Sequence, residues 1–397
     1  MKNSIIVVCL CMFLFNCVDN TKSKITKSNL AKNSTKVIVH YMGWYSDKNA
    51  SNKKLRHWEH GYANTPIIGA YNSKSKATLV YHTLLAWLSG IDAIAINIKD
   101  KYDYETMVEL FNTIDELQSI SKENFNLKYL ISYDDQGFDL EEPLDTTFIK
   151  MKDFKENIMK RKNYLYHKKH PLFFSFDYPK KFLTAKSFST VIDSVFKNNK
   201  PYLIWNTFGE GEEVQPYVNA FYPWVQPGGE WDEKGLNWGK DYLNYFYDEV
   251  NTFETKSSFV VGGVWAGFDD RKNTSWGGNR LISRQNGKVF DDTWNYIHNY
   301  QGKIPMDYVV LETWNDWNEG TEIEPSLEHG YQYLTKTAKH VNKLKGTNIK
   351  ENSLKFELAK EIHDAIQNNN DTISELLKET IELFCKKNYK QVQEKLK

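Results

Sequence analysis

The sequence has little cysteine, and its placement rules out a disulfide framework. Of the four cysteines in 397 residues, Cys9, Cys11 and Cys17 lie near the N-terminus and Cys385 lies near the C-terminus. If Cys17 is acylated and becomes the first residue of the mature chain, only Cys385 is left as a free thiol. This excludes disulfide bonds and a cysteine-based metal site. The fold must then be held together by its hydrophobic core.

The sequence also lacks an excess of charge and a set of metal ligands. The 51 basic residues balance 51 acidic residues, and no basic cluster interleaves with aromatic residues. This argues against nucleic acid as a partner. His57 and His60 are three residues apart, but no third clear ligand accompanies them. We therefore predict no metal and no other cofactor. The sequence does not indicate an oligomeric state.

The N-terminus has the features of an export signal. Lys2 precedes an apolar run from Ile5 to Phe15, which at about eleven residues is too short to span a bilayer. The segment Leu14-Phe15-Asn16-Cys17 resembles a lipoprotein signal, in which Cys17 would be lipidated; the alternative is an ordinary secretory signal. Residues 1–17 are thus predicted to be a signal peptide and residues 18–36 a flexible tether. We expect an exported protein, lipid-anchored to the cell envelope at the outer membrane or cell surface, and otherwise periplasmic or secreted.

Short buried strands alternate with helical segments from residue 37 onward. Apolar, β-branched runs predict strands at 37–41, 91–98, 127–133, 171–176, 201–205, 218–222, 259–264 and 308–313. Helical patterns fall at 78–88, 104–121, 148–167, 185–198, 236–252, 293–301 and 328–344. This order predicts an α/β fold, a (β/α)8 TIM barrel over residues 37–345. Two amphipathic helices, 352–367 and 372–396, form a C-terminal helical appendage within residues 346–397.

Most of the predicted strands end in Asp, Asn, Trp or Tyr. In a barrel these ends converge on one face, where active sites are built. Together with the aromatic loop that follows the first strand, they predict a set of substrate-binding side chains: Tyr41, Trp44, Tyr45, Trp58, His60, Tyr133, Asp177, Tyr178, Trp205, Trp265, Asp269, Asp270, Trp314 and Asn315. The competing interpretation is that the aromatic residues, 15% of the chain, form a large aromatic core.

The stretch 308–326 is the most informative part of the sequence. A buried-strand pattern leads into Glu312-Thr313-Trp314-Asn315-Asp316-Trp317-Asn318-Glu319-Gly320-Thr321-Glu322-Ile323-Glu324. Carboxylates interleaved with Trp suit a sugar site, because a planar ring covers the apolar face of a pyranose while carboxylates bond hydroxyls and move protons. The stretch therefore predicts an active-site loop. The alternative is an acidic, solvated loop whose Trp residues are wedged into the core.

Residues 315–324 resemble the signature Asn-Glu-Trp-His-Glu-Gly-Thr-Gln-Ile-Glu of glycoside hydrolase family 99, the endo-α-mannosidases and endo-mannanases. Gly267-Phe268-Asp269-Asp270 and Arg284-Gln285-Asn286-Gly287-Lys288 are similar to that family's Gly-Tyr-Asp-Asp and Arg-x-Asn-Gly-Lys segments. Phe174-Ser175-Phe176-Asp177-Tyr178 is similar to its Tyr-x-Tyr-Asp-Ser-Tyr. The three blocks lie in the family's order.

The resemblance implies a glycoside hydrolase acting on α-linked oligo- or polysaccharides, endo-acting and of mannan type. Asp316 would remove the proton of the sugar's own 2-hydroxyl to give a 1,2-anhydro sugar. Glu319 would act first as acid and then as base, with net retention. Glu322 and Glu324 are expected to pin the loop through hydrogen bonds.

Asp316 departs from the family pattern, which has Glu at this position. The shorter side chain brings the motif nearer to the Asn-Asp-x-Gly-Glu segment of the family 71 α-1,3-glucanases. A family 71-like α-glucanase or another α-glycosidase therefore remains an alternative. A non-catalytic glycan-binding surface lipoprotein is the third hypothesis.

Overall fold

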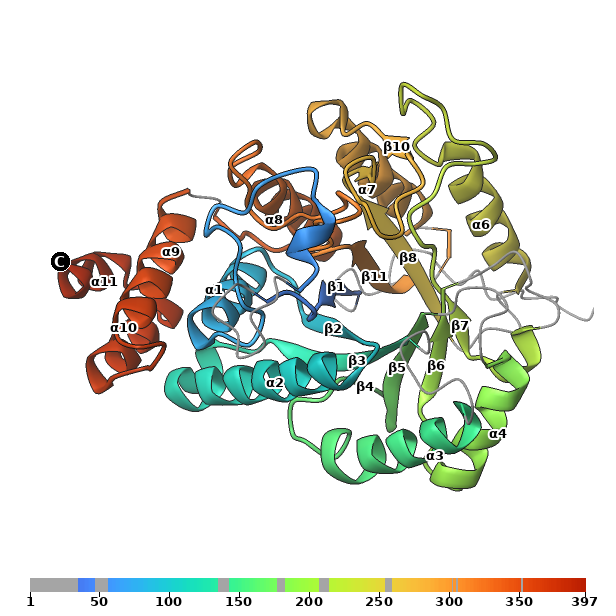
Figure 1. Cartoon of the computed structure of the whole chain (residues 1–397), viewed down its shortest axis with the longest axis horizontal. Coiled ribbons are helices and arrows are strands. Elements are labelled where there is room, and N and C mark those ends of the chain that lie inside the picture. Colours follow the sequence, from blue (N-terminus) through green and yellow to red (C-terminus); the bar gives the residue numbers. More distant parts are fainter. Residues whose placement is uncertain are drawn as a thin grey trace, which may run out of the picture. The chain divides into compact units, whose positions relative to one another are not determined.

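Parallel strands form the centre of the fold, and their buried side chains share one hydrophobic core with those of the surrounding helices (Figure 1). In chain order they are β1 (Lys36–Met42), β2 (Ala93–Ile98), β3 (Lys128–Asp134), β5 (His170–Phe176), β6 (Tyr202–Trp205), β7 (Ala220–Phe221), β8 (Val260–Trp265) and β11 (Met306–Glu312). Their spatial order is β7-β6-β5-β3-β2-β1-β11-β8, and β7 packs against β8. The strands therefore form a nearly closed barrel, as predicted.

In this computed structural model, the structure describes residues 35–46, 56–134, 143–176, 183–206, 214–253, 259–301, 303–304, 306–350 and 353–397. The predicted signal peptide, most of the predicted tether, Cys17, Asp177 and Tyr178 lie outside these residues.

The first and last strands of the barrel pair with each other. Val37 of β1 lies opposite Val309 of β11, and Val39 lies opposite Ile94 of β2. The three successive β-branched side chains of β1, Val37, Ile38 and Val39, are fully buried. Such runs are apolar because a parallel strand is covered on both faces.

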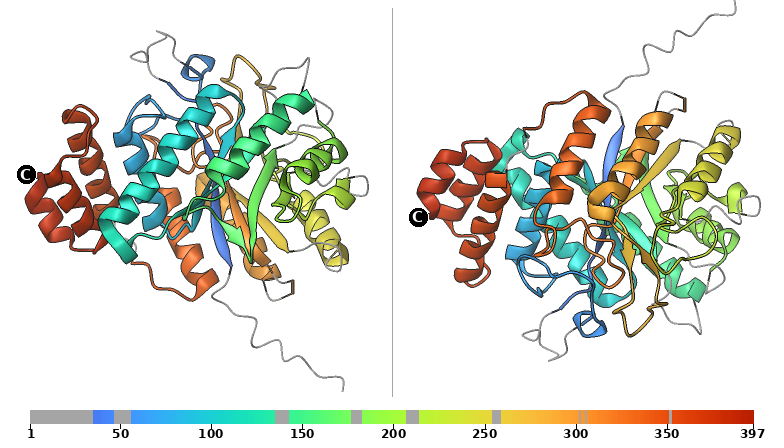
Figure 2. Two further views of the ribbon diagram at one scale, coloured as in Figure 1. Left: turned by 90° about the horizontal axis from the view of Figure 1, so that it is seen from below. Right: turned by 90° about the horizontal axis from the view of Figure 1, so that it is seen from above.

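Helices surround the strands (Figure 2). They are α1 (Lys76–Leu88), α2 (Lys101–Ser121), α3 (Pro143–Asp153), α4 (Ala185–Phe196), α6 (Lys240–Phe253), α7 (Lys288–Tyr300) and α8 (Gln332–Lys345). Side chains at the N-terminus cap two of these helices. Ser75 accepts a hydrogen bond from the Thr78 N–H at the start of α1, and Thr184 and Ser187 form a capping box at the start of α4. Within the described residues, no helix has the length and apolarity needed to cross a membrane.

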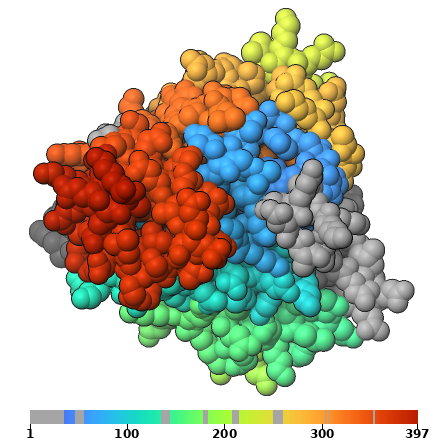
Figure 3. Space-filling view, turned by 60° about the vertical axis from the view of Figure 1, so that its left-hand side comes forward, coloured from blue at the N-terminus to red at the C-terminus, as the bar shows by residue number. Residues whose placement is uncertain are grey.

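Three further helices follow the barrel: α9 (Ser353–Asn368), α10 (Glu375–Cys385) and α11 (Tyr389–Leu396). α9 packs against α1, and α10 packs against α2. Figure 3 shows these helices beside the N-terminal part of the barrel. The helix predicted over 372–396 is thus two helices, separated at Lys387, whose φ is 61°.

The helix predicted over 148–167 also differs from the structure. α3 ends at Asp153, a π-helix covers Phe154–Ile158, and Tyr166–His167 form β4, antiparallel to β5. Lys168 makes the turn between them with φ 55°. A second small hairpin, β9 (Phe268–Asp269) with β10 (Leu281–Ile282), follows β8.

Candidate active site

Three buried polar side chains, His40, Ser132 and Glu312, contact one another on the inner face of the barrel. His40 on β1 reaches across to β3, where its Nε2 lies 2.7 Å from Ser132 Oγ. Its Nδ1 lies 3.0 Å from Oε2 of Glu312, the last residue of β11. Burial raises the pKa of Glu312, and His40 opposes this shift. Side chains in register with His40 and Glu312 therefore point into the barrel, and their chain neighbours point toward the helices.

The loop after β11 folds into a tight turn that brings Asp316 and Glu319 together. The Asp316 N–H donates to Thr313 Oγ1 (2.8 Å), and the Thr321 N–H donates to Asp316 O (3.2 Å). The Glu319 N–H donates to the Asp316 carboxylate at Oδ1 (3.1 Å). Asp316 is buried, whereas Glu319 is half-buried. The two predicted catalytic carboxyl groups thus belong to one turn at the C-terminal end of the barrel.

Both carboxyl groups resist ionisation. Burial raises the pKa of Asp316, and the nearby Glu319 raises it further. Burial also raises the pKa of Glu319, while Arg280 and a hydrogen bond from Trp276 oppose the shift. A raised pKa favours the protonated form that a general acid needs, and it also makes the carboxylate a stronger base once it is ionised.

Trp276 contacts Glu319 directly, and sequence reasoning missed it. Its indole Nε1–H donates to Glu319 Oε1 (3.1 Å). Its ring packs edge-on against Trp44, His57 and His60, at centroid distances of 6.2, 5.5 and 5.6 Å. The only available signal was a Trp between the two family-like segments around Asp270 and Arg284.

The loop after β1 packs against the motif loop, which is the loop of residues 313–326 that follows β11. The Tyr45 hydroxyl accepts a hydrogen bond from the Trp317 N–H (3.0 Å) and donates to Asn318 Oδ1 (3.2 Å). Trp58 donates its indole N–H to Tyr71 O (2.9 Å). Trp44 stacks on His57 at 4.8 Å, and among the described residues its indole nitrogen has no hydrogen-bond partner.

Asn315 joins the motif loop to the end of β1. Its Oδ1 accepts from the Met42 N–H (2.7 Å), and its Nδ2 donates to Met42 O (2.9 Å) and to the Tyr71 hydroxyl (3.0 Å). The side chain is fully buried. Its polar atoms are therefore used within the protein, which differs from the expectation that Asn315 faces a substrate.

Glu322 and Glu324 pin the loop, which confirms that prediction. Glu322 forms an ion pair with Arg284 (2.7 Å) and accepts a hydrogen bond from Asn64 (2.7 Å). Glu324 accepts from the Tyr71 hydroxyl (2.8 Å) and lies 2.9 Å from His82 Nε2 on α1.

Asp269 and Asp270 hold neighbouring backbone rather than an open cavity. Asp270 is fully buried, pairs with Arg280 (2.7 Å) and accepts the Gly278 and Arg280 N–H groups (2.8 and 2.6 Å). It thereby closes the loop that carries Trp276. Asp269 binds Arg271, and its N–H donates to Glu319 O (2.7 Å).

Four predicted substrate-binding residues face the surrounding helices instead. The Tyr133 hydroxyl lies 3.0 Å from Thr147 Oγ1 on α3, and Trp205 packs against Phe188 on α4. Tyr41 and Trp314 both contact His82 on α1. Alternation along the strands explains Tyr41 and Tyr133, since their neighbours His40 and Ser132 point inward. These positions correct the expectation that all strand ends face a substrate.

Trp265 is the remaining strand-end tryptophan. It lies in register with Glu312, and so on the inner face, but it is fully buried and donates its indole N–H to Trp238 O (3.0 Å). The described residues contain no group of three His, Cys, Asp or Glu side chains placed to hold a metal ion.

No protein-family model matches the sequence, and no curated protein matches it either. Solved structures do match. A GH99 endo-α-mannosidase from Bacteroides thetaiotaomicron, in complex with bis-tris propane, has a TM-score of 0.63 and 16% identity, covering 78% of this chain and 97% of that one. The chain has a family 99-like fold.

Two further structures agree with this result. Another structure of the GH99 enzyme from Bacteroides thetaiotaomicron has a TM-score of 0.63 and 15% identity, covering 80% of this chain and 98% of that one. A glycoside hydrolase-like protein has a TM-score of 0.55 and 14% identity, covering 78% and 95%. The family 99-like fold predicted from the motifs is therefore confirmed.

Proposed function

We propose that the protein is a glycoside hydrolase that cleaves α-linked glycans, with Asp316 and Glu319 as its catalytic pair. The observation that carries the proposal is the turn in which the Glu319 N–H binds the Asp316 carboxylate (3.1 Å). This turn lies at the C-terminal end of a barrel strand, where TIM-barrel active sites are found. The family 99-like fold supports the same assignment.

In the proposed reaction, ionised Asp316 removes the proton of the sugar's 2-hydroxyl, and that oxygen attacks the anomeric carbon. Protonated Glu319 gives its proton to the departing glycosidic oxygen, which leaves a 1,2-anhydro sugar. Glu319 then takes a proton from water, which opens the strained ring at the anomeric carbon, while Asp316 returns its proton to the 2-oxygen. Two inversions give net retention. The raised pKa of Glu319 suits its proposed role as the acid, and the raised pKa of Asp316 makes that carboxylate a stronger base once it is ionised.

The substrate we propose is an α-mannan chain cut internally, because the similar solved enzymes are endo-α-mannosidases. Trp44 and Trp276 supply aromatic rings beside Glu319 on which sugar rings can stack. We further propose that the protein acts in the cell envelope, anchored through a lipid on Cys17. Loss of labelling by a radioactive fatty acid in Cys17→Ser would support the anchor, and unchanged labelling would contradict it.

The decisive experiment compares Glu319→Gln and Asp316→Asn with the parent on α-mannans and α-1,3-glucan, following the anomeric products by NMR. We expect α-configured products from mannan and a loss of hydrolysis on the order of 1,000-fold in both variants, with mannan binding preserved. Glu59→Gln, an exposed carboxyl in the same region, is the matched control. Full activity of Glu319→Gln would contradict the proposal. Inverted products, or cleavage of glucan only, would favour a family 71-like α-glucanase.

A further inference from the structure

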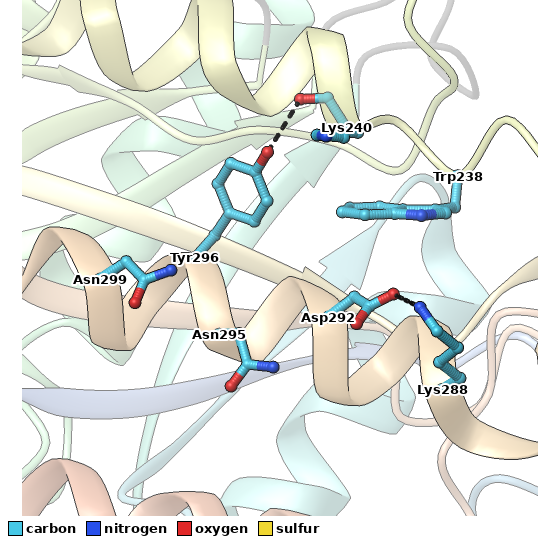
Figure 4. A pocket seen from close by; sticks show the side chains of 7 residues that line it. All are labelled: Trp238, Lys240, Lys288, Asp292, Asn295, Tyr296 and Asn299. Carbon is cyan, nitrogen blue, oxygen red and sulfur yellow. Dashed lines mark hydrogen bonds and ion pairs between the residues drawn. The ribbon is translucent and has the colours of Figure 1, made fainter.

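A groove on the outer side of the barrel lies between the segment before α6 and the helix α7 (Figure 4). Its volume is about 360 Å³, within the range of small-ligand sites. The lining residues are Trp238, Lys240, Lys288, Asp292, Asn295, Tyr296 and Asn299. Among the interactions of the described residues, none joins these side chains to Asp316 or Glu319.

We propose that this groove is a second glycan-binding site, which holds a neutral sugar chain without cleaving it. The nature of the ligand rests on the proposed function, because a glycan-cleaving enzyme meets polymeric sugar. The groove itself rests on independent observations of its two walls.

One wall is the Trp238 indole, which is half-buried and faces the groove. Its ring meets Tyr296 edge-on at 5.9 Å, and its backbone carbonyl accepts the Trp265 indole N–H (3.0 Å). Gly239 follows with φ 96°, and a Cβ there would lie 2.3 Å from Gln226 O and 2.9 Å from the Trp265 ring. The backbone around Trp238 is therefore held in one place, as a stacking platform requires.

The other wall is a row of polar side chains along α7. Lys288, Asp292, Asn295 and Asn299 lie at spacings of about three to four residues, so they share one face of the helix. Lys288 and Asp292 form an ion pair. The Asn295 and Asn299 amides are exposed and, among the described residues, form no hydrogen bond or ion pair with the protein. Each amide can donate and accept, which matches adjacent sugar hydroxyls.

The charge of the groove favours a neutral ligand. Lys288 is neutralised by Asp292, which leaves Lys240 as the one cation of the lining without an acidic partner among the described residues. A single lysine is too little for a polyanion such as nucleic acid. An indole face opposite free amides instead fits a pyranose, whose C–H face stacks on the ring while its hydroxyls bind the amides.

A second site of this kind would keep a long polymer beside the catalytic face by raising its effective concentration. It would contribute nothing to the cleavage of a short oligosaccharide that occupies only the loops around Asp316. Comparing a long polymer with a short oligosaccharide therefore distinguishes a loss of binding in the groove from a loss of activity at the proposed catalytic site.

The test uses the full chain, native gel electrophoresis in the presence of soluble α-mannan or α-1,3-glucan, and hydrolysis of a short α-manno-oligosaccharide. Trp238→Ala and the double variant Asn295→Ala/Asn299→Ala should each weaken retardation by the polymer at least about five-fold, since stacking on an indole, and the hydrogen bonds of two amides together, are each worth roughly 1 kcal/mol or more. Hydrolysis of the short substrate should stay within about two-fold. Tyr245→Ala, an exposed aromatic residue of α6 outside the groove, is the control.

The double variant guards against a folding defect in Trp238→Ala, because both asparagines lie on an exposed helix face. Unchanged retardation in both variants, or no retardation of the parent by either polymer, would overturn the inference. So would an equal loss on the short substrate, which would make the groove part of the catalytic cleft. Reduced retardation in a chain that hydrolyses nothing would support the groove while the proposed hydrolase function fails.

Discussion

His40 Nδ1 lies 3.0 Å from Glu312 Oε2, and both side chains are fully buried inside the barrel. A buried pair of this kind is costly to break, because removing one partner leaves the other desolvated and unpaired. Glu312→Leu should therefore lower the free energy of unfolding by about 3–5 kcal/mol. The double variant His40→Leu/Glu312→Leu should lose less than the sum of the two single losses. Urea denaturation of all four proteins measures this coupling, and strictly additive losses would show that the pair does not act as a unit.

Trp276→Phe tests the contact with Glu319. The indole N–H favours the ionised form of Glu319, so its removal should raise the pKa of Glu319 further. If Glu319 acts in its protonated form, the alkaline limb of the pH profile of kcat/KM should move to higher pH, and the rate should fall about 10–100-fold. Trp231→Phe, at a ring that packs on Phe268, is the control. A lower rate with an unmoved alkaline limb would reduce Trp276 to a packing residue.

Asp316→Glu would restore the residue found in family 99, and we expect it to reduce activity rather than improve it. Asp316 is 2% exposed, and its carboxylate is fixed by the Glu319 N–H at 3.1 Å. One more methylene would displace the carboxylate by about 1 Å, which can lower a rate on the order of 100-fold. Steady-state kinetics on the cleaved glycan measure the change. Activity equal to or above that of the parent would mean that the turn adapts to either length.

Asp103 gives a test of stability against pH. Burial, and then the charge of Asp100, raise the pKa of Asp103 from 3.8 to about 7. The pKa of Asp103 is therefore higher in the folded state than in the unfolded state. The protonated Asp103 side chain contributes fully to stability below the unfolded-state pKa, and this contribution is lost as the pH rises through the folded-state pKa. Asp103→Asn cannot ionise, so it should remove this loss, at most about 4 kcal/mol by pH 8.

Thermal melts from pH 4 to pH 8 measure the effect, with Asp145→Asn on the exposed part of α3 as the control. A parent and an Asp103→Asn variant that lose stability in parallel over this range would contradict the assignment of the loss to Asp103.

The strands were predictable because buried parallel strands leave a strong local pattern. Ala93–Ile98 and Met306–Glu312 are nearly continuous apolar runs, and the predicted strands overlap the observed ones. The break in the helix predicted over 372–396 was not predictable, because Lys387 adopts a positive φ without being a glycine. Nothing in the local sequence marks a lysine for that conformation.

The turn that carries the candidate site was predictable from the sequence, and the side chains around that turn were not. The motif placed Asp316 and Glu319 on one loop, and the expectation that Glu322 and Glu324 hold this loop by polar contacts is confirmed. The orientation of Tyr133 and Trp205 depends on strand register, and one residue of shift reverses the face. Trp276 lies in a loop without periodicity, so only the folded chain brings it to Glu319.

The pairing of β1 with β11 has a consequence for the order of events during synthesis. Lys36 to Val39 find their partners at residues 308–311, almost at the end of the barrel. Because synthesis proceeds at about 5–20 residues per second, one edge of β1 stays unpaired for roughly 15–50 s before β11 is made. The loop that carries Asp316 and Glu319 leaves the ribosome just after β11, so the barrel closes and the proposed catalytic pair is completed at the same late stage of synthesis.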